Sequence, residues 1–296
     1  MKKMIDIETF TQPSSLQSSL VSLCERYLRE HNLRQRPLPT WLKSLCFLRR
    51  NRDSSEPANI LKPAGQSLIG YIKNSLREGR FKFDAPKLCF KEKVVGHQRR
   101  SPCPARAKEL LGEMNSSFLG QFRTISILNP KDLLVQTMLL KILESNLDKS
   151  FSKYSYAFRP GKTHHQRAAI VQFRRYLSQG YAYVLILDIE NFFYRIDHNI
   201  IMRLLRESLR MNLKCEPAWI LALMEDFLRV CRQAYGFSSS RGIVQGAPLS
   251  PFLSNLYLNP LDRFLDQRKI KFVRYCDDAR LFFKSQESCQ AALKKI

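Results

Sequence analysis

Two adjacent acids, Asp277 and Asp278, interrupt an otherwise apolar, strand-like stretch near the end of the sequence. The flanking segments 271–276 and 279–283 are rich in Val, Phe, Tyr and Leu, which predicts a β-hairpin with the acids at its tip. Asp is also common in solvated turns, so the pair alone does not establish a chemical site. Further acids are needed to decide between a turn and a metal site.

A third acid, Asp188, closes the apolar run 183–187, which predicts a strand buried on both faces with its carboxylate at the edge of the core. Carboxylates on neighbouring strands repel one another, and their pKa values rise unless cations neutralise them. Oxygen ligands suit Mg²⁺, so the acids predict a site for two Mg²⁺ ions, with Mn²⁺ as an alternative. Two such ions roughly 3.5 to 4 Å apart activate an attacking hydroxyl and stabilise the leaving oxygens of a phosphoryl displacement. This is the chemistry of nucleotide polymerisation.

The composition indicates a polyanionic partner. The sequence has 49 Lys and Arg against 26 Asp and Glu, a net charge of +23 and an isoelectric point near 9.9. A basic excess of this size is typical of proteins that bind nucleic acid. No apolar run reaches about 18 residues, and the N-terminus lacks the apolar core of a signal peptide. The cysteines are scattered, which favours reduced thiols, so we expect a cytoplasmic protein with no membrane partner.

The elements that must position the acids do not alternate in a regular β-α-β order, which favours an α+β fold. Apolar periodicity predicts helices over 15–50 (two, around a proline turn), 132–147, 164–177, 198–232 (broken near Pro217) and 251–264. Alternating apolar residues predict a strand over 122–127. The segment 237–246 is expected to be a hairpin or a loop.

Five sequence blocks occur in a specific order around the acids. They are 122–127 (Phe-Arg-Thr-Ile-Ser-Ile), 154–161 (Tyr-Ser-Tyr-Ala-Phe-Arg-Pro-Gly), 188–193 (Asp-Ile-Glu-Asn-Phe-Phe), 245–251 (Gln-Gly-Ala-Pro-Leu-Ser-Pro) and 275–278 (Tyr-Cys-Asp-Asp). Any single block is weakly diagnostic, but their order and spacing are specific. Over roughly residues 80–296, the chain resembles the fingers and palm of bacterial reverse transcriptases of the group II intron and retron-like kind.

The resemblance implies a right-hand polymerase architecture with an antiparallel palm sheet packed on helices. We expect a helical N-terminal extension at 1–70, basic RNA-binding fingers at 71–180 and the palm at 181–296. In an alternative division, the fingers re-enter at 198–240. The sequence stops 18 residues after Asp278, so the thumb is expected to be absent from this chain. Either the sequence is a fragment of a longer protein, or a structured non-coding RNA or a partner subunit supplies the clamp on the duplex.

The resemblance also assigns roles to the acids. Asp188 and Asp277 are expected to hold both metals, and the backbone carbonyl of Ile189 completes one coordination sphere. Asp278 is expected at the edge of the site. All three carboxylates are therefore catalytic and metal-binding candidates.

Three further residues are implied to bind the incoming dNTP. Phe193 matches the steric gate, whose ring excludes a ribose 2′-hydroxyl, with plain core packing as the alternative. Phe192 is the better candidate for the core, because neighbours on a strand face opposite ways. Gln245 and Gly246 match the turn that lies against the nucleotide, where glycine lets the backbone approach closely.

Basic residues complete the expected site. Arg123 and Lys131 are candidates for gripping the triphosphate, since cations stabilise the charge of a transferring phosphoryl group. The arginine that the family carries after Asp132 is replaced by Leu133, so Lys131 or the Lys91/Lys93 cluster is expected to take its place. Arg159 is expected to order its loop and to lie near the template.

The segment from residue 73 to residue 108 contains eleven Lys or Arg and only three acids, with aromatic residues interleaved, which favours RNA binding. The candidates there are Lys91, Lys93, Arg99 and Arg100.

The sequence therefore predicts an RNA-directed DNA polymerase that extends a DNA primer on an RNA template with dNTPs, in a prokaryotic antiphage-defence or retroelement system. Template-independent or protein-primed synthesis by the same site is one alternative. A non-catalytic, RNA-binding scaffold is another. The clustered acids argue against the scaffold, because without metal ions they would only destabilise it.

Overall fold

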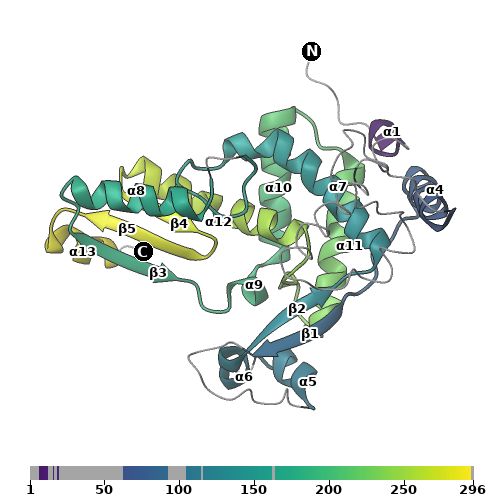
Figure 1. Ribbon diagram of the computed structural model, residues 1–296, viewed down its shortest axis with the longest axis horizontal. Helices are drawn as coiled ribbons and strands as arrows, with labels where there is room; N and C mark the ends of the chain where they lie inside the picture. Colours follow the sequence, from purple (N-terminus) through teal and green to yellow (C-terminus); the bar gives the residue numbers. More distant parts are fainter. Residues whose placement is uncertain are drawn as a thin grey trace, which may run out of the picture.

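The computed structural model describes residues 7–12, 16, 19, 63–92, 105–114, 116–161 and 164–294. Figure 1 shows a three-stranded sheet at one end of the molecule, a group of long helices beside it, and a two-stranded sheet that projects from the helices. Both sheets are antiparallel, so the expected mixture of helices and antiparallel strands is confirmed.

The helices and strands follow one another without a repeating unit. The helices are α1 (Ile7–Phe10), α4 (Pro63–Arg77), α5 (Ala107–Gly112), α6 (Ser116–Gln121), α7 (Pro130–Leu147), α8 (Gln166–Ser178), α9 (Phe192–Arg195), α10 (His198–Leu213), α11 (Ala218–Tyr235), α12 (Leu249–Gln267) and α13 (Gln286–Leu293). The strands are β1 (Lys87–Glu92), β2 (Phe122–Ile127), β3 (Tyr183–Asp188), β4 (Lys271–Tyr275) and β5 (Asp278–Phe283). The predicted strands and the helix break near Pro217 are confirmed. The helix pair expected over 15–50 lies outside the described residues, apart from residues 16 and 19.

The long helices α7, α10, α11 and α12 share one apolar core. Leu134, Leu205, Met224 and Leu253, one from each helix, are fully buried within it. Pro130 occupies the first turn of α7, where its missing N–H costs no hydrogen bond. Of the described helices, none is both long and apolar enough to cross a lipid bilayer.

The three-stranded sheet has the order β3–β5–β4. Its register pairs Asp188 with Asp278, so acids that are far apart in the sequence lie opposite each other on neighbouring strands. The predicted hairpin is confirmed, and its tip is the two-residue connection Cys276–Asp277. Helices α12 and α13 pack against one face of the sheet, and α8 packs against the other.

The expectation that the Asp188 strand is buried on both faces is wrong. Strand β3 lies at the edge of the sheet, and Ile186 is 63% exposed. Helix α8 covers Val184 and Phe282 but does not extend over the end that carries Asp188 and Asp278. One face of the sheet is therefore open beside the acids, and an apolar sequence run could not reveal this because it records composition and not the covering helix.

Two buried acids fasten the segment that leads into β1. Asp226 of α11 accepts a hydrogen bond from the Phe83 backbone N–H at 2.6 Å, and Asp132 of α7 accepts one from the Asp84 N–H at 2.9 Å. The second carboxylate oxygen of Asp132 is buried without a hydrogen-bond partner. The two-stranded sheet is thus tied to the helical core through backbone groups at its base.

Burial raises the pKa of Asp132 to about 6, above its value of about 3.9 in an unfolded chain. A raised folded-state pKa means that the folded protein binds the proton more tightly, so stability falls as the carboxyl ionises. The measured quantity is the free energy of unfolding of the wild type minus that of Asp132→Asn. We expect this difference to fall between about pH 4 and pH 6 and then level off. Urea unfolding of both proteins across this range tests the prediction, and a pH-independent difference would contradict it.

Candidate active site

A cleft of about 1170 Å³ opens where the end of β3 meets the β4–β5 turn. Its walls also include α9, the turn at 245–248, the loop at 158–160 and the start of β2. Asp188, Ile189 and Asp277 all line it. The tertiary structure therefore gathers the expected carboxylates and the Ile189 peptide around one open space.

Asp278 differs from the other two acids. It is not among the residues that line the cleft, and its carboxylate forms an ion pair with Arg280 on the same strand. Among the described residues, no three His, Cys, Asp or Glu side chains lie close enough to form a metal-binding group. Of the three predicted acids, Asp188 and Asp277 line the cleft, and Asp278 lies beside them in the sheet.

The donors around the acidic turn fit a hard divalent cation. Carboxylate and peptide oxygens are the ligands that Mg²⁺ prefers. The thiol of Cys276 lies next to Asp277, but burial, followed by the charge of Asp277, raises the pKa of Cys276 to about 11. The thiol therefore stays protonated at neutral pH, and it approaches the Ser254 hydroxyl at 3.8 Å. The site offers oxygen ligands without a competing thiolate.

The buried side chain of Arg274 forms a hydrogen bond with the backbone of the acidic turn. The Arg274 side chain is 1% exposed and forms a bidentate ion pair with Asp262 of α12, at 2.8 and 2.6 Å. The same guanidinium donates to the Cys276 carbonyl at 2.8 Å. Cys276 adopts a φ of +62°, which is uncommon for a residue with a side chain and must be stabilised by its surroundings.

The contacts of Arg274 continue into the neighbouring loop. Arg274 donates to the Asn255 side-chain oxygen at 3.1 Å, and the Asn255 amide donates to the Ala157 carbonyl at 2.8 Å. Sequence reasoning missed this network. The available signal was a charged residue inside an apolar strand, together with an acid on the preceding helix, but the sequence alone did not pair them.

The two phenylalanines after Asp188 lie on a helix and not on a strand. Phe192 and Phe193 begin α9, so the strand-alternation argument for their different roles was wrong. Phe192 is 4% exposed and belongs to the core, whereas Phe193 is half-buried. Both touch the cleft lining. Phe193 therefore has a partly free ring at the cleft, as a selectivity contact requires.

The Gln245–Gly246 turn is docked on β2. The Gln245 carbonyl accepts hydrogen bonds from the Ser126 N–H at 2.7 Å and the Ser126 hydroxyl at 2.8 Å. Gly246 has a φ of +97°, and a Cβ there would lie 3.3 Å from Ile125 Cγ2. The glycine is required by backbone conformation and by close packing against β2, and both residues line the cleft.

The basic residues expected to bind phosphate lie in different places: Arg123 lines the cleft, and Lys131 does not. Arg123 is exposed on β2, lines the cleft and has no ion pair among the described residues. Lys131 does not line the cleft, because its ammonium donates to the Lys82 carbonyl at 2.7 Å and pairs with Asp84 at 3.2 Å. Lys91 is exposed on β1 opposite Arg123. Lys93, Arg99 and Arg100 lie outside the described residues.

The Arg159 side chain binds residues of its own loop and of the preceding turn. Its guanidinium forms a two-point ion pair with Asp148, at 2.8 and 2.9 Å, and donates to the Ser152 carbonyl at 2.6 Å. Only 4% of the side chain is exposed. These contacts give Arg159 the loop-ordering role, while a contact with the template stays a prediction.

Glu144 is a cleft residue that the sequence analysis did not identify. Burial, followed by the nearby charge of Asp148, raises the pKa of Glu144 to about 7. This carboxyl group therefore changes protonation near neutral pH, on the side of the cleft that holds Arg159.

Comparisons with known proteins found a matching family and several relatives. Residues 111–296 match the family described as reverse transcriptase (RNA-dependent DNA polymerase). The chain is 30% identical over 152 residues to the putative COX1/OXI3 intron 2 protein of Saccharomyces cerevisiae, covering 50% of this chain and 17% of that protein. It is 31% identical over 175 residues to the group II intron-encoded protein LtrA of Lactococcus lactis, covering 58% of this chain and 27% of that protein.

A third relative is protein YkfC of Escherichia coli, 26% identical over 188 residues, which cover 60% of this chain and 44% of YkfC. The chain thus spans less than half the length of these three relatives. Among solved structures, a partial Cas6-RT-Cas1–Cas2 complex shares 18% identity, with coverage of 98% of this chain and 41% of the other and a TM-score of 0.40.

Proposed function

The chain belongs to the reverse transcriptase (RNA-dependent DNA polymerase) family, and from this premise we propose that it extends a DNA primer with dNTPs on an RNA template. The observation that carries the proposal is the cleft at the acidic turn, where Asp188 and Asp277 face the same space. Two carboxylates that face a shared cleft are suited to hold divalent cations against the phosphates of a nucleotide.

In this proposal, Asp188 and Asp277 supply carboxylate ligands and Ile189 supplies its backbone carbonyl. When bound, two Mg²⁺ ions, or Mn²⁺ in their place, activate the primer 3′-hydroxyl and stabilise the leaving pyrophosphate. Asp278 is proposed to lie at the edge of this site, where the positive charge of Arg280 partly offsets its negative charge. The open face of the sheet beside these acids gives a primer end room to approach.

The dNTP is proposed to lie between the acids and β2. Arg123 is the exposed cation of the cleft wall and is suited to the triphosphate. The Gln245–Gly246 turn is proposed to contact the sugar or base, and Phe193 to exclude a 2′-hydroxyl. Lys91 and Arg159 are proposed template contacts, with Lys91 the more exposed of the two.

The biological setting is proposed to be a prokaryotic antiphage-defence system or retroelement. The substrates are then an RNA template, a DNA primer or product, and dNTPs. A structured RNA or a partner subunit is proposed to hold the duplex. The net charge of +23 supports stable association with RNA.

Radiolabelled dNTP incorporation on poly(rA)/oligo(dT) tests the proposal. Incorporation should require Mg²⁺, stop when the ion is chelated, and depend on the poly(rA) strand. Incorporation that persists on the primer alone would instead indicate template-independent synthesis. RNA binding with no incorporation on any primer would indicate the non-catalytic scaffold.

Phe193→Ala should allow ribonucleotides to enter by removing the ring that opposes the 2′-hydroxyl. We expect the ratio of kcat/KM for dTTP over UTP to fall by about tenfold or more, which corresponds to about 1.4 kcal/mol. The matched control is Phe192→Ala, which should lower stability by about 3–5 kcal/mol because it creates a cavity in the core. Equal selectivity in the wild type and Phe193→Ala would show that Phe193 is only a packing residue.

A further inference from the structure

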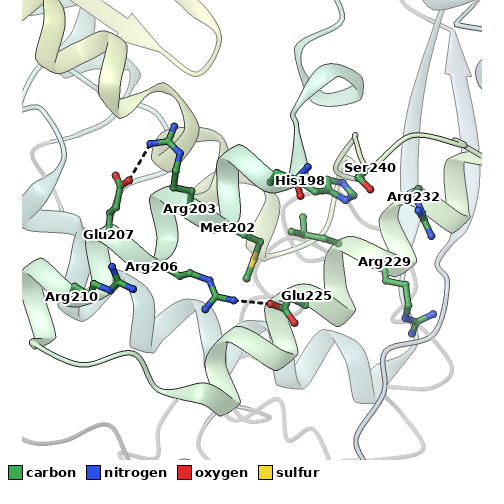
Figure 2. A pocket seen from close by; sticks show the side chains of 12 residues that line it. His198, Met202, Arg203, Arg206, Glu207, Arg210, Glu225, Arg229, Arg232 and Ser240 are labelled. Carbon is green, nitrogen blue, oxygen red and sulfur yellow. Dashed lines mark hydrogen bonds and ion pairs between the residues drawn. The ribbon is translucent and has the colours of Figure 1, made fainter.

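A groove separate from the cleft runs between α10 and α11 and is lined with arginines (Figure 2). Its volume is about 660 Å³. Helix α10 contributes Arg203, Arg206 and Arg210, spaced so that they share one side of the helix, and α11 contributes Arg229 and Arg232. The groove and the cleft share no lining residue.

A second hollow of about 590 Å³ extends this groove toward α9. The two hollows share Asn199 and Ser240, and the second adds Arg195 and Arg241. Arg195 follows Phe193 by two residues on α9, so one short helix borders both the cleft and the groove. The groove therefore starts next to the cleft and leads away from it.

The lining has an excess of positive charge. Seven arginines line the two hollows against the acids Asp197, Glu207 and Glu225. Three acids outside the lining, Glu190, Glu216 and Asp226, pair with four of the arginines, which are Arg195, Arg206, Arg210 and Arg229. The Asp197 carboxylate is already occupied, because it accepts the Asn199 and Ile200 N–H groups at the start of α10. Burial lowers the pKa of His198, so that imidazole adds no charge at neutral pH.

Several of these arginines are available to a ligand. Among the described residues, Arg203 pairs with Glu207 on its own helix alone, and both side chains are about half exposed, so the ion pair is weak. Arg232 and Arg241 have no ion pair within the described part of the chain. The Nε atom of Arg241 is buried without a hydrogen-bond partner, so it is not itself open to an anion. An incoming anion would pair with Arg203 and Arg232 without breaking an ion pair between α10 and α11.

The chemistry of the lining specifies the anion. Every basic side chain that lines the groove, apart from neutral His198, is an arginine, and its planar fork binds phosphate through two hydrogen bonds. The apolar lining consists of Met202 and Leu228, with no aromatic ring on which a base could stack. Such a surface binds a backbone and does not read a sequence.

We propose that this groove binds the phosphodiester backbone of a nucleic acid strand outside the active-site cleft. The proposal rests on the groove's own charges and is independent of polymerase activity. The strand lies along the two hollows, and Arg203 of α10, Arg232 of α11 and Arg241 contact its phosphates. Binding is independent of base sequence.

Equilibrium binding of a fluorescein-labelled oligo(rA), measured by anisotropy against salt without Mg²⁺ or dNTPs, tests this groove. The double variant Arg203→Gln/Arg232→Gln removes two cations that do not join α10 to α11. If each guanidinium contacts one phosphate, the slope of log K against log salt should decrease by about 1.4, or about 0.7 per lost contact. Arg203→Lys/Arg232→Lys keeps both charges and should keep the slope.

The charge-matched control is Arg174→Gln/Arg175→Gln on α8, where both side chains are exposed away from the groove. If the slope of log K against log salt decreases equally in this control, the change depends only on the overall charge of the protein, and the proposal is overturned. Displacement of the RNA by poly-glutamate as readily as by unlabelled oligo(rA) would also overturn it, because the groove would then prefer an acidic protein. Asp277→Asn should bind with the wild-type slope, so failure of the polymerase assay leaves this test intact.

Discussion

Asp277→Asn should reduce Mg²⁺-dependent dNTP incorporation by more than about a hundredfold, the loss typical when one group that stabilises developing charge is removed. Asp277 is half-buried at the hairpin tip and lines the cleft, so the amide would occupy the same volume but provide no negative charge. Raising the Mg²⁺ concentration should not restore the rate. The rate constant is measured in a single-turnover assay on poly(rA)/oligo(dT).

Two controls separate this effect from a general loss of charge. Asp278→Asn makes the same chemical change one residue later, and its loss should be smaller because Asp278 pairs with Arg280 and does not line the cleft. Glu287→Gln changes an exposed acid in the first turn of α13 and should keep the wild-type rate. Undiminished incorporation by Asp277→Asn would remove the acidic turn from the mechanism.

Arg274→Met should lower the free energy of unfolding by about 3–5 kcal/mol, because it leaves the Asp262 carboxylate buried without its partner. Both side chains are at most 1% exposed, so water cannot replace the lost ion pair. Burial already raises the pKa of Asp262 even with Arg274 present, which shows how unfavourable this charge would be alone. Urea unfolding, followed by circular dichroism, measures the loss.

The double variant Arg274→Met/Asp262→Leu separates stability from positioning. Replacing both members of a buried ion pair by apolar residues is often neutral for stability, so the double variant should recover most of the lost free energy. Incorporation should stay low, since no donor then reaches the Cys276 carbonyl that Arg274 holds at 2.8 Å. A double variant with full activity would show that Arg274 has only a structural role.

Several features of the site were accessible from the sequence. The apolar runs around Asp188 and around Asp277–Asp278 predicted strands that end in acids, and β3, β4 and β5 confirm those strands. Gly246 has a φ of +97° and packs closely against β2, while its approach to the nucleotide stays a prediction. These features are local, because strand propensity and glycine conformation depend on neighbouring residues.

Other arguments from the sequence were limited because the contacts depend on distant partners. Phe192 and Phe193 were assigned by strand alternation, although they form a helical turn in which Phe192 points into the core. Lys131 was expected near the triphosphate, but the backbone of Lys82 and the carboxylate of Asp84 bind its ammonium away from the cleft. Charge and spacing alone cannot show which of these contacts a flexible lysine makes.

The sequence by itself determined which acids are present, the strands that carry them and the order of the motifs around Asp188 and Asp277. Only the tertiary structure decided which acids face the cleft, because that depends on the register that pairs Asp188 with Asp278 and on the ion pair that engages Asp278. It also decided that Arg274 supports the turn, through a partner on a different element. Local propensities act over a few residues, whereas these contacts arise when separate elements pack together.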